Sequence, residues 1–454
     1  MGRTLKSAQE VVALIEGVTS ALNPDAVAAI AIGEPAWLRE RREHAWSVYE
    51  RTPMPSTRLE EWRYTDLRKK LDLGALRLAD GGPGSDDPEA WPDRLREAMD
   101  EDHEASGHMV LIDGHVVHAD LDASLASKGV VLCSLHEAVA KHASAVREHL
   151  AVTVPAEDGK FAALNAALWA DGIFLHVPRG VRLELPVRVT RWFSESAAAY
   201  FSRVLIVAER ESQVSYVDEI LSEDFAAPTL ASTAVEVIAR DGAQVQYVAV
   251  QRLGKGAFYQ SVQRTLAGRD AKLDTLNVGL GASVSRVDLN ARLLGPGANS
   301  DMFGLYFGDG TQHFDFNTSQ DHVTPNTSSD LLYKGALDGS SRAVFRGIIR
   351  VHPGAQRTDA YQKNRNLLLS PKAHADSLPN LEIQADDVKC SHGATVGELD
   401  EEAKFYLMSR GLDRVTAERL VVLGFLGEVL SKLPLGGVSE KVTRVIEEKL
   451  AQHG

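Results

Sequence analysis

Cysteine is almost absent from this chain: two of its 454 residues are cysteine, Cys133 and Cys390. This count excludes a disulfide framework, and the C-x-x-C and H-E-x-x-H patterns of common zinc sites are missing as well. No apolar run approaches the ~18 residues of a membrane-spanning helix. The first residues lack the apolar core of a secretory signal. We therefore expect a cytoplasmic protein without a membrane partner.

Nucleotide-binding and hydrolase motifs are also missing. The Gly-containing segments "GLGASVS" and "GKGAF" lack the Lys-Ser/Thr pair of a P-loop, and no G-x-S-x-G is present. Basic side chains are in deficit, because 49 Lys and Arg stand against 63 Asp and Glu, a formal net charge of −14. This balance argues against nucleic acid or an anionic membrane as the main partner. The sequence thus predicts neither an ATPase nor a nucleic-acid-binding protein.

Short β-rich runs separated by small polar turns fill residues 171–397. The residues just after successive turn centres are Val181, Ser212, Ala243, Ala271 and Ala298, which lie 31, 31, 28 and 27 residues apart. A period in this range, with further turns between, is typical of a β-solenoid with two main faces. A β-sandwich would have turns every ~8–12 residues without the larger repeat, and it remains the alternative.

The sequence on both sides of this region has helical periodicity. We divide the chain into an N-terminal helical region (1–105), a mixed lead-in (106–170), the β-solenoid (171–397) and a C-terminal helical region (398–454). The lead-in contains a predicted hairpin across Asp113-Gly114. The expected fold class is therefore mainly β, a β-solenoid flanked by helices.

Several helix ends can be predicted from capping residues. The segment "SAQEVVALIEGVTSAL" begins at Ser7, a predicted N-cap. In the C-terminal region Asp400, Asp413 and Ser439 are predicted N-caps, and a glycine ends the first of these helices. Residues 415–433 are apolar on nearly all faces, which predicts a helix that is either deeply buried or docked on a partner.

The segment "EIQADDVKCSHGATVG", residues 382–397, holds the second cysteine and, two positions later, a histidine. We interpret it as one strand, so that Cys390 and His392 share a face with Val388 and Asp386. Thiolate and imidazole suit zinc, copper or iron–sulfur centres, but a closed site takes four ligands and the chain offers no obvious others. The pair is then half of a metal site that another molecule completes, a structural pair in the core, or, least favoured by its geometry, a Cys-His nucleophile.

Another group of polar residues lies in "DGTQHFDFNTSQDH". His313 and Asp315 fall on one face of a predicted strand, and His322 lies downstream. We interpret them as ladder residues of the solenoid, and a second polar site is the alternative. Cys133, in a different part of the chain, is expected to pack structurally.

Residues 358–412, which include "NLEIQADDVKCSHGATVGELDEEAKFYLMSRGL", closely resemble the C-terminal signature of the SufB/SufD family. These proteins are scaffold subunits of the SUF iron–sulfur cluster assembly system. "KFAALNAALWADGIFLHVPRGV" is similar to the family's segment leading into the solenoid. "KCSHGATVG" and "STRLEEWRYTDL" resemble the SufD branch, and the further cysteines of the SufB branch are missing. The resemblance implies a right-handed parallel β-helix between helical ends.

The resemblance also implies partners, namely SufB and a pair of SufC ATPases. His392 and Cys390 match the residues that face SufB, where a nascent iron–sulfur cluster forms, so no cofactor is expected to stay bound to this chain alone. The C-terminal helices are expected to carry SufC, through Phe405, Arg410, Gly411, Val422, Phe425 and Leu426. A homodimer is expected as another assembly when SufB is absent.

The function that follows is a non-enzymatic scaffold subunit. The alternatives are a SufB-like paralogue or homodimeric scaffold, a stand-alone zinc- or iron-binding protein that uses Cys390 and His392, and a β-helix enzyme acting on polysaccharide. Such an enzyme needs acids and bases clustered along a groove, which this sequence does not clearly offer. The type of cluster and the involvement of a flavin stay open.

Overall fold

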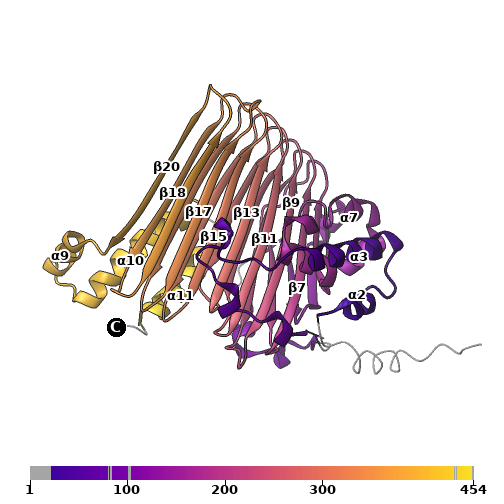
Figure 1. The fold of residues 1–454 in the computed structure, drawn as a ribbon, viewed down its shortest axis with the longest axis horizontal. Coiled ribbons are helices and arrows are strands. Elements are labelled where there is room, and N and C mark those ends of the chain that lie inside the picture. Colours follow the sequence, from indigo (N-terminus) through magenta and orange to yellow (C-terminus); the bar gives the residue numbers. More distant parts are fainter. Residues whose placement is uncertain are drawn as a thin grey trace, which may run out of the picture.

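The computed structural model describes residues 22–79, 81, 84–100, 104–433, 435 and 437–451. Its main body is a parallel β-solenoid in which two sheets of ten strands face each other (Figure 1). From β5 onward the chain passes from one sheet to the other at each turn, so odd-numbered strands form sheet A and even-numbered strands form sheet B. The parallel β-helix expected from the sequence is confirmed.

The strands of each sheet follow in spatial order. Sheet A contains β4 (Val131–Ser134), β5 (Asp171–Val177), β7 (Ala198–Ala208), β9 (Thr229–Ala239), β11 (Ala257–Ala267), β13 (Val284–Leu293), β15 (His313–His322), β17 (Arg342–Val351) and β19 (His374–Ile383), with β1 (Arg77–Leu78) paired to β7. Sheet B contains β3 (His115–Leu121), β2 (Gly107–Ile112), β6 (Val187–Phe193), β8 (Gln213–Ser222), β10 (Gln244–Arg252), β12 (Lys272–Gly279), β14 (Asn299–Gly308), β16 (Ser328–Leu337), β18 (Asp359–Leu368) and β20 (Lys389–Glu398).

Successive coils stack in register. Along sheet B the parallel pairing runs through Arg182, Gln213, Gln244, Lys272 and Asn299. These coils therefore span 31 (213 − 182), 31 (244 − 213), 28 (272 − 244) and 27 (299 − 272) residues, the four steps predicted from the turns. Parallel pairing of consecutive coils requires a crossover at each step, which excludes the sandwich alternative.

Side chains alternate along each strand, and those pointing inward fill the interior of the solenoid. Tyr216 and Tyr247 are register partners on β8 and β10, and their buried rings stack with centroids 5.7 Å apart. Burial of a large apolar side chain contributes ~1.5–3 kcal/mol relative to exposure. One ion pair lies among these rings: Arg191 donates to both carboxylate oxygens of Asp218, at 2.8 and 2.6 Å.

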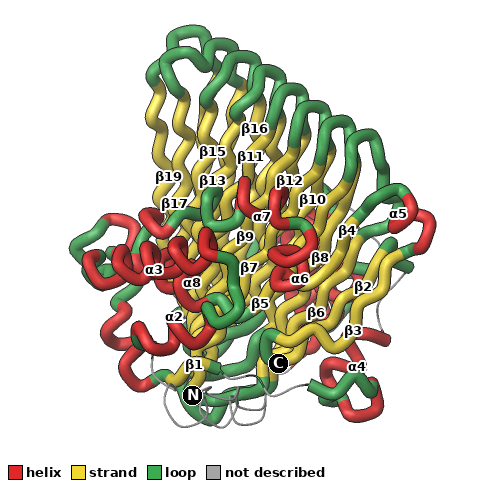
Figure 2. The backbone as a smooth tube through the Cα atoms, turned by 90° about the vertical axis from the view of Figure 1, so that its right-hand side faces the viewer, coloured by secondary structure: helices red, strands yellow, loops and turns green. Residues whose placement is uncertain are grey.

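Helices of the N-terminal half lie against the first coils (Figure 2). They are α2 (Pro24–Ile30), α3 (Ala36–Arg51), α4 (Asp93–Asp100), α5 (Ala123–Ser127), α6 (Leu135–Lys141), α7 (Ala143–His149) and α8 (Lys160–Leu168). Helix α8 is buried along its length, and Asn165 on it donates at 3.1 Å to the carbonyls of Ser202 and Ser232 in sheet A. The hairpin predicted at Asp113-Gly114 is confirmed by the antiparallel pairing of β2 with β3. The predicted helix that starts at Ser7 lies outside the described residues.

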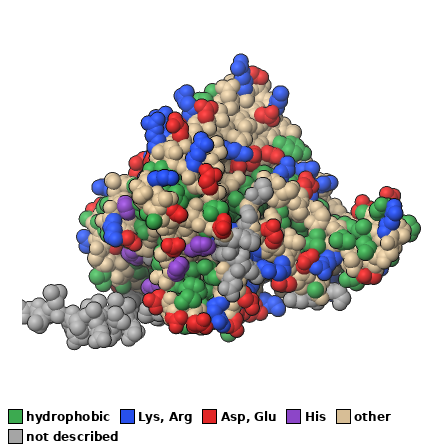
Figure 3. Space-filling model, turned by 180° about the vertical axis from the view of Figure 1, so that it is seen from behind, with side chains coloured by type: hydrophobic (Ala, Val, Ile, Leu, Met, Phe, Trp, Pro, Cys, Tyr) green, Lys and Arg blue, Asp and Glu red, His purple; other side chains and the backbone are tan. Residues whose placement is uncertain are grey.

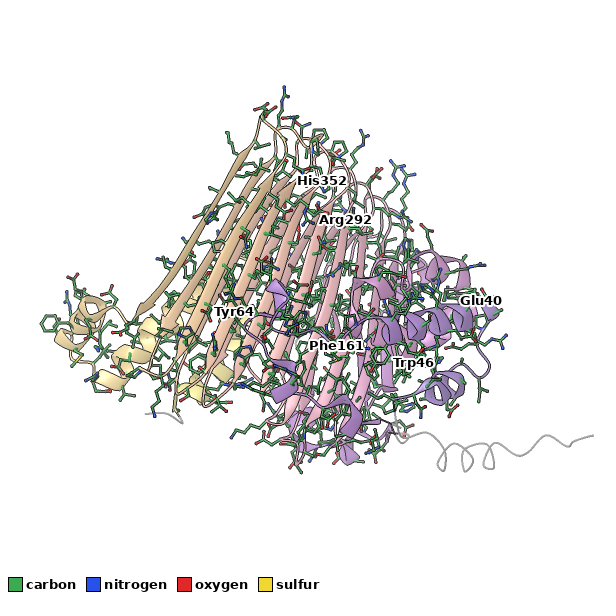
Figure 4. All side chains as sticks on the ribbon, viewed as in Figure 1. Glu40, Trp46, Tyr64, Phe161, Arg292 and His352 are labelled. Atoms are coloured by element: carbon green, nitrogen blue, oxygen red, sulfur yellow. The ribbon has the colours of Figure 1, made fainter. Side chains whose placement is uncertain are left out.

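Residues 53–79, here called the strap, cross the outer face of sheet A. They form three short 3-10 turns, Glu60–Trp62, Leu67–Lys69 and Leu73–Ala75, and a fourth follows the strap at Pro88–Ala90. The helical interpretation of the first hundred residues is therefore wrong here, because the prolines at 53 and 55 disfavour a helix and the side chains pack on the sheet. The Arg286 guanidinium lies 3.7 Å from the Trp62 ring centroid, and Figure 4 shows Tyr64 over the middle strands.

Three helices follow the last strand: α9 (Glu401–Ser409), α10 (Arg414–Leu430) and α11 (Val438–Ala451). The predicted caps of the first two are confirmed, because Asp400 accepts from the backbone of the first turn of α9 and Asp413 does so for α10. The third predicted cap, Ser439, is wrong, because α11 begins at Val438 and Ser439 lies inside the helix. The four-part division of the chain stays a prediction, and β2–β4 of the lead-in belong to the same two sheets.

Candidate functional site

The solenoid stops at a coil that nothing in the described chain covers. Within the described residues β19 pairs only with β17, and β20 pairs only with β18. Figure 1 shows β20 as the outermost strand, and we call the coil of β19 and β20 the open end. The prediction that 382–397 is one strand is wrong: the segment comprises the end of β19, a corner at 384–388 and most of β20. The polar Asp386-Asp387 pair makes the corner, so Asp386 and Val388 share no strand face with the cysteine and histidine.

Cys390 and His392 do share a face of β20 as predicted, and that face is the inward one. Their register partners in the coil below are the buried residues Ala360 and Gln362. Cys390 is half-buried and packs beside an apolar cluster that includes Ile349, whereas His392 is exposed. The open end therefore presents an imidazole and a thiol from what would be core positions in any earlier coil.

The surroundings of the Cys390 thiol shift its pKa toward the protonated form. Burial raises the pKa of the thiol, the nearby Asp359 carboxylate raises it further, and a hydrogen bond with the backbone of Ala360 opposes the rise. Because the thiolate is the ligand form, this raised pKa disfavours metal binding by Cys390. An imidazole, by contrast, binds metal as the neutral ring.

Apolar side chains around the pair are also left uncovered. Leu381 and Ile383 on β19 and Val396 on β20 are 38, 41 and 44% exposed. The first two are register partners of Ile349 and Val351, which are fully buried in the preceding coil. Unpaired strand edges beside an exposed interior layer favour pairing with another chain.

The described residues contain no group of three or more His, Cys, Asp or Glu side chains arranged to hold a metal ion. The inward face of the open end offers two donors, Cys390 and His392, whereas closed zinc and iron–sulfur centres take four. Any such centre built here needs ligands from outside this chain.

The other polar residues singled out in the sequence are tied into the fold. His313 and Asp315 point outward from β15 beneath the strap, where Thr65 Oγ1 lies 2.8 Å from His313 Nε2 and donates to Asp315 Oδ2 at 2.5 Å. Arg286 pairs with the same carboxylate, and burial lowers the pKa of His313 to about 4. This group holds the strap on sheet A.

His322 points into the solenoid, away from His313 and Asp315, so the three do not form one site. Its two ring nitrogens lie 2.8 Å from Thr327 Oγ1 and 2.9 Å from Ser329 Oγ. Burial lowers its pKa to about 4. Cys133 is buried in the core between sheet A and the N-terminal helices.

The six residues expected to dock SufC separate into two groups. Phe405 is 73% exposed on α9, the exposed Arg410 lies with its guanidinium 5.2 Å from the Tyr406 ring centroid, and Gly411 ends the helix with a φ of +94°. The other three lie on α10 and face this chain's own sheet B. Val422 and Leu426 are each 1% exposed, and Phe425 packs against the same cluster.

Besides Phe405, the C-terminal helices carry exposed apolar side chains that the sequence interpretation missed. Tyr406, Met408, Val415 and Leu420 are 56, 40, 56 and 44% exposed on α9 and α10. Figure 3 shows the lobe that carries α9 at the right edge, with hydrophobic side chains on its surface. The sequence signal is the run "FYLM" in a short helix, where adjacent apolar residues cannot all face one side.

Two family models match this chain. "SUF system FeS cluster assembly, SufBD core domain" matches residues 191–425, and "SufBD protein N-terminal region" matches residues 102–189. No helix in the described part of the chain has the length and apolar character needed to span a membrane.

Curated relatives agree with these models along most of the chain. The "Iron-sulfur cluster assembly protein SufD" of Bacillus subtilis is 34% identical over 425 residues, which is 92% of this chain and 95% of that protein. An "Iron-sulfur cluster assembly SufBD family protein" of Staphylococcus epidermidis is 27% identical over 88% of this chain and 87% of its own length, and one of Staphylococcus haemolyticus is 26% identical over the same shares. The solenoid that ends in this uncovered coil is thus part of a chain that belongs to the SufBD family of iron–sulfur cluster assembly proteins.

Proposed function

We propose that this chain is a non-catalytic scaffold subunit of the SUF system, in which the open end pairs with SufB and a nascent iron–sulfur cluster is built between the two chains. The observation that carries the proposal is the position of His392. It lies on an inward face, in a coil that leaves the face uncovered, beside one half-buried thiol.

The donor count supports a shared site. Iron–sulfur clusters are held mostly by thiolates, and this chain places one thiol and one imidazole on the inward face of the open end. A partner strand on β20 would satisfy the free edge, cover Val396, and bring its own ligands to the same layer. The cluster is then cargo of the pair of chains, and no resident cofactor of this chain is needed.

The ATPase partner is proposed to dock on the exposed apolar surface of α9 and the start of α10. This surface includes the exposed rings of Phe405 and Tyr406, and the guanidinium of Arg410 lies 5.2 Å from the Tyr406 ring centroid. An exposed aromatic patch of this kind is typical of protein–protein contacts. Helix α9 follows β20 directly, so a force applied to α9 by a nucleotide-driven partner would reach the strand that carries His392.

His392→Ala tests the shared site. The side chain is exposed, so its loss should leave the unfolding temperature and the recovery of the SufB–SufC complex near wild type. Loss of cluster formation in the reconstituted complex, followed by absorbance and iron content, is the expected result. His374→Ala is the matched control, because His374 is also exposed on the last coil but points outward, and it should assemble clusters normally. If His392→Ala assembles clusters at the normal rate, His392 has no role in assembly and the proposal is wrong.

A further inference from the structure

Beneath His392 the inward face of β18 carries a row of polar side chains. The inward residues of β16 include Leu331 and Tyr333, and their register partners on β18 are Gln362 and Asn364, with Asn366 the next inward residue. All three amide side chains are at least 96% buried, at 1, 1 and 4% exposure. Buried carboxamides also lie in earlier coils, such as Gln263 and Asn277, which bond each other, so the row is notable for its place one layer below an uncovered coil.

Two of the three amides are fully engaged. Asn364 Oδ1 accepts from Asn366 Nδ2 at 2.8 Å and from Ser377 Oγ at 2.7 Å, and Asn364 Nδ2 donates to the Tyr333 carbonyl at 3.3 Å. Asn366 Oδ1 accepts from the hydroxyl of Tyr306. These bonds fix the row and explain why two of its members tolerate burial.

Gln362 differs from its neighbours in the row. Its Oε1 has no hydrogen-bond partner among the described residues. Its Nε2 makes two contacts at the outer limit of hydrogen bonding, 3.5 Å each, to the carbonyls of Gly347 and Asn380. A buried acceptor without a partner is unfavourable, and each one in a native structure calls for an explanation.

The register supplies a partner for that oxygen. Gln362 and His392 are directly paired on adjacent parallel strands and both point inward, so their Cβ atoms lie about 5 Å apart. The carboxamide now lies against β17 and β19 and is weakly held there, so a change of side-chain rotamer can bring Oε1 to the imidazole. A histidine that binds metal through one ring nitrogen donates its other N–H to such an acceptor, which fixes the tautomer and the ring orientation.

We propose that Gln362 is a positioning residue for His392: its carboxamide oxygen accepts the imidazole N–H and directs the other ring nitrogen to the nascent cluster. This inference rests on the proposed function, since it assigns a role within the same site. Gln362 itself makes no contact with the cluster and acts through the histidine.

Three variants in the reconstituted complex with SufB and SufC test the role. Gln362→Met keeps the length of the side chain and removes the acceptor, and it should slow initial cluster assembly by roughly tenfold. Gln362→Glu restores an acceptor and should recover the rate to within about twofold of wild type. The matched control is Gln320→Met: Gln320 is also fully buried with an unpartnered Oε1, but it lies on β15, two coils below β19, and its loss should not change the rate.

The second measurement is the coupling of histidine ¹⁴N to the reduced cluster in pulsed electron paramagnetic resonance. If Gln362 had only a structural role, its replacement would leave this coupling unchanged. Wild type should show the coupling, Gln362→Met should show an altered one, and Gln362→Glu should restore it. Wild-type rate and coupling in Gln362→Met overturn the inference, and so does an equal loss in Gln320→Met, which would mean a general disturbance of the interior.

Failure of the inference and failure of the proposed function are separable. If wild type lacks the coupling and His392→Ala assembles clusters normally, the shared site itself is wrong. If Gln362→Met does not fold, Gln362→Asn asks the same question, because its shorter side chain keeps the amide but withdraws it from the ring. Gln362→Asn should then match the expected tenfold loss, and a wild-type rate contradicts the inference.

Discussion

Lys334 on β16 donates a hydrogen bond from its ammonium to the backbone carbonyl of Phe425 on α10, at 2.8 Å. The same ammonium pairs with Glu428 and lies 4.3 Å from the centroid of the Phe425 ring. The side chain of Lys334 is 2% exposed, and burial lowers its pKa. Helix α10 is thus fixed to the outer face of sheet B by a buried cation as well as by apolar packing.

Leu426→Asp should therefore destabilise the chain itself. It places a carboxylate without a partner among the apolar residues between α10 and sheet B, a change that costs about 2–5 kcal/mol. The unfolding temperature measured by circular dichroism should fall, and limited proteolysis should cut first in the C-terminal helices.

Phe405→Asp is the counterpart on the surface. Phe405 is 73% exposed, so the free energy of unfolding should change by less than about 0.5 kcal/mol while binding of the ATPase partner weakens. Calorimetric titration with SufC measures the second effect. Equal SufC affinity for this variant and wild type would show that the patch on α9 is not the docking surface.

The repeat of the solenoid could be predicted because coils that pair in register place their turns at a regular spacing along the sequence. Gln213 stacks on Arg182 and Gln244 on Gln213, so each coil must return to the same corner after a fixed number of residues. The corner at 384–388 could not be predicted in the same way. The local sign of a corner there is the polar pair Asp386-Asp387, which interrupts the alternation in "ADDVKC" without the Gly or Pro that commonly marks a turn.

The site could be predicted only in part, for a similar reason. Spacing places Cys390 and His392 on one face, but which face looks inward depends on the stack of coils. Gln362 lies 30 residues upstream of His392 (392 − 362) and becomes its neighbour only through the pairing of β18 with β20. An apolar helix that packs on its own sheet, as α10 does, has the same pattern as one that docks on a partner, so the pattern leaves both open, and the assignment of Val422 and Leu426 to an interface rests on the family resemblance.

Cys390→Ser should reduce cluster assembly less than His392→Ala. The raised pKa of the thiol keeps it protonated, so it contributes less as a ligand during the first steps of assembly than an exposed imidazole does. Initial rates of both variants in the same complex give the comparison. If Cys390→Ser lost more of the assembly rate than His392→Ala, Cys390 would be the more important donor of the two.

Asp218→Ala should strongly destabilise the solenoid. Arg191 and Asp218 are 1 and 0% exposed in their side chains, and removing the acid leaves a buried guanidinium without a counter-charge, which costs about 3–5 kcal/mol. The control is Arg179→Ala, which breaks the exposed pair between Arg179 and Glu211 and should change the free energy of unfolding by less than about 1 kcal/mol. Denaturant unfolding of both variants measures the difference.

Acid should weaken the fold through two buried histidines. Burial is the main cause that lowers the pKa of His313 to about 4, with Lys70, Arg342 and Arg286 acting in the same direction and Asp315 against it. The unfolded chain has its histidine pKa near 6.5, so between pH ~6.5 and ~4 the unfolded state binds more protons than the folded state. Stability is then fully present above pH ~6.5, is lost as pH falls toward 4, and levels off below.

Stability depends on pH in the same direction through His322, because burial also lowers its pKa to about 4, with Asp321 acting against the shift. Each histidine adds up to 1.36 kcal/mol per pH unit to the slope of stability against pH. Between pH ~6.5 and ~4 this amounts to about 3 kcal/mol for each histidine. Replacing both with glutamine, which keeps a hydrogen-bonding side chain at each place, should lower the slope between pH 5 and 6 by up to about 2.7 kcal/mol per unit. Denaturant midpoints measured every half unit of pH for wild type and the double variant give both slopes. If wild type and the double variant had the same slope of stability against pH, burial would not lower the pKa of either histidine.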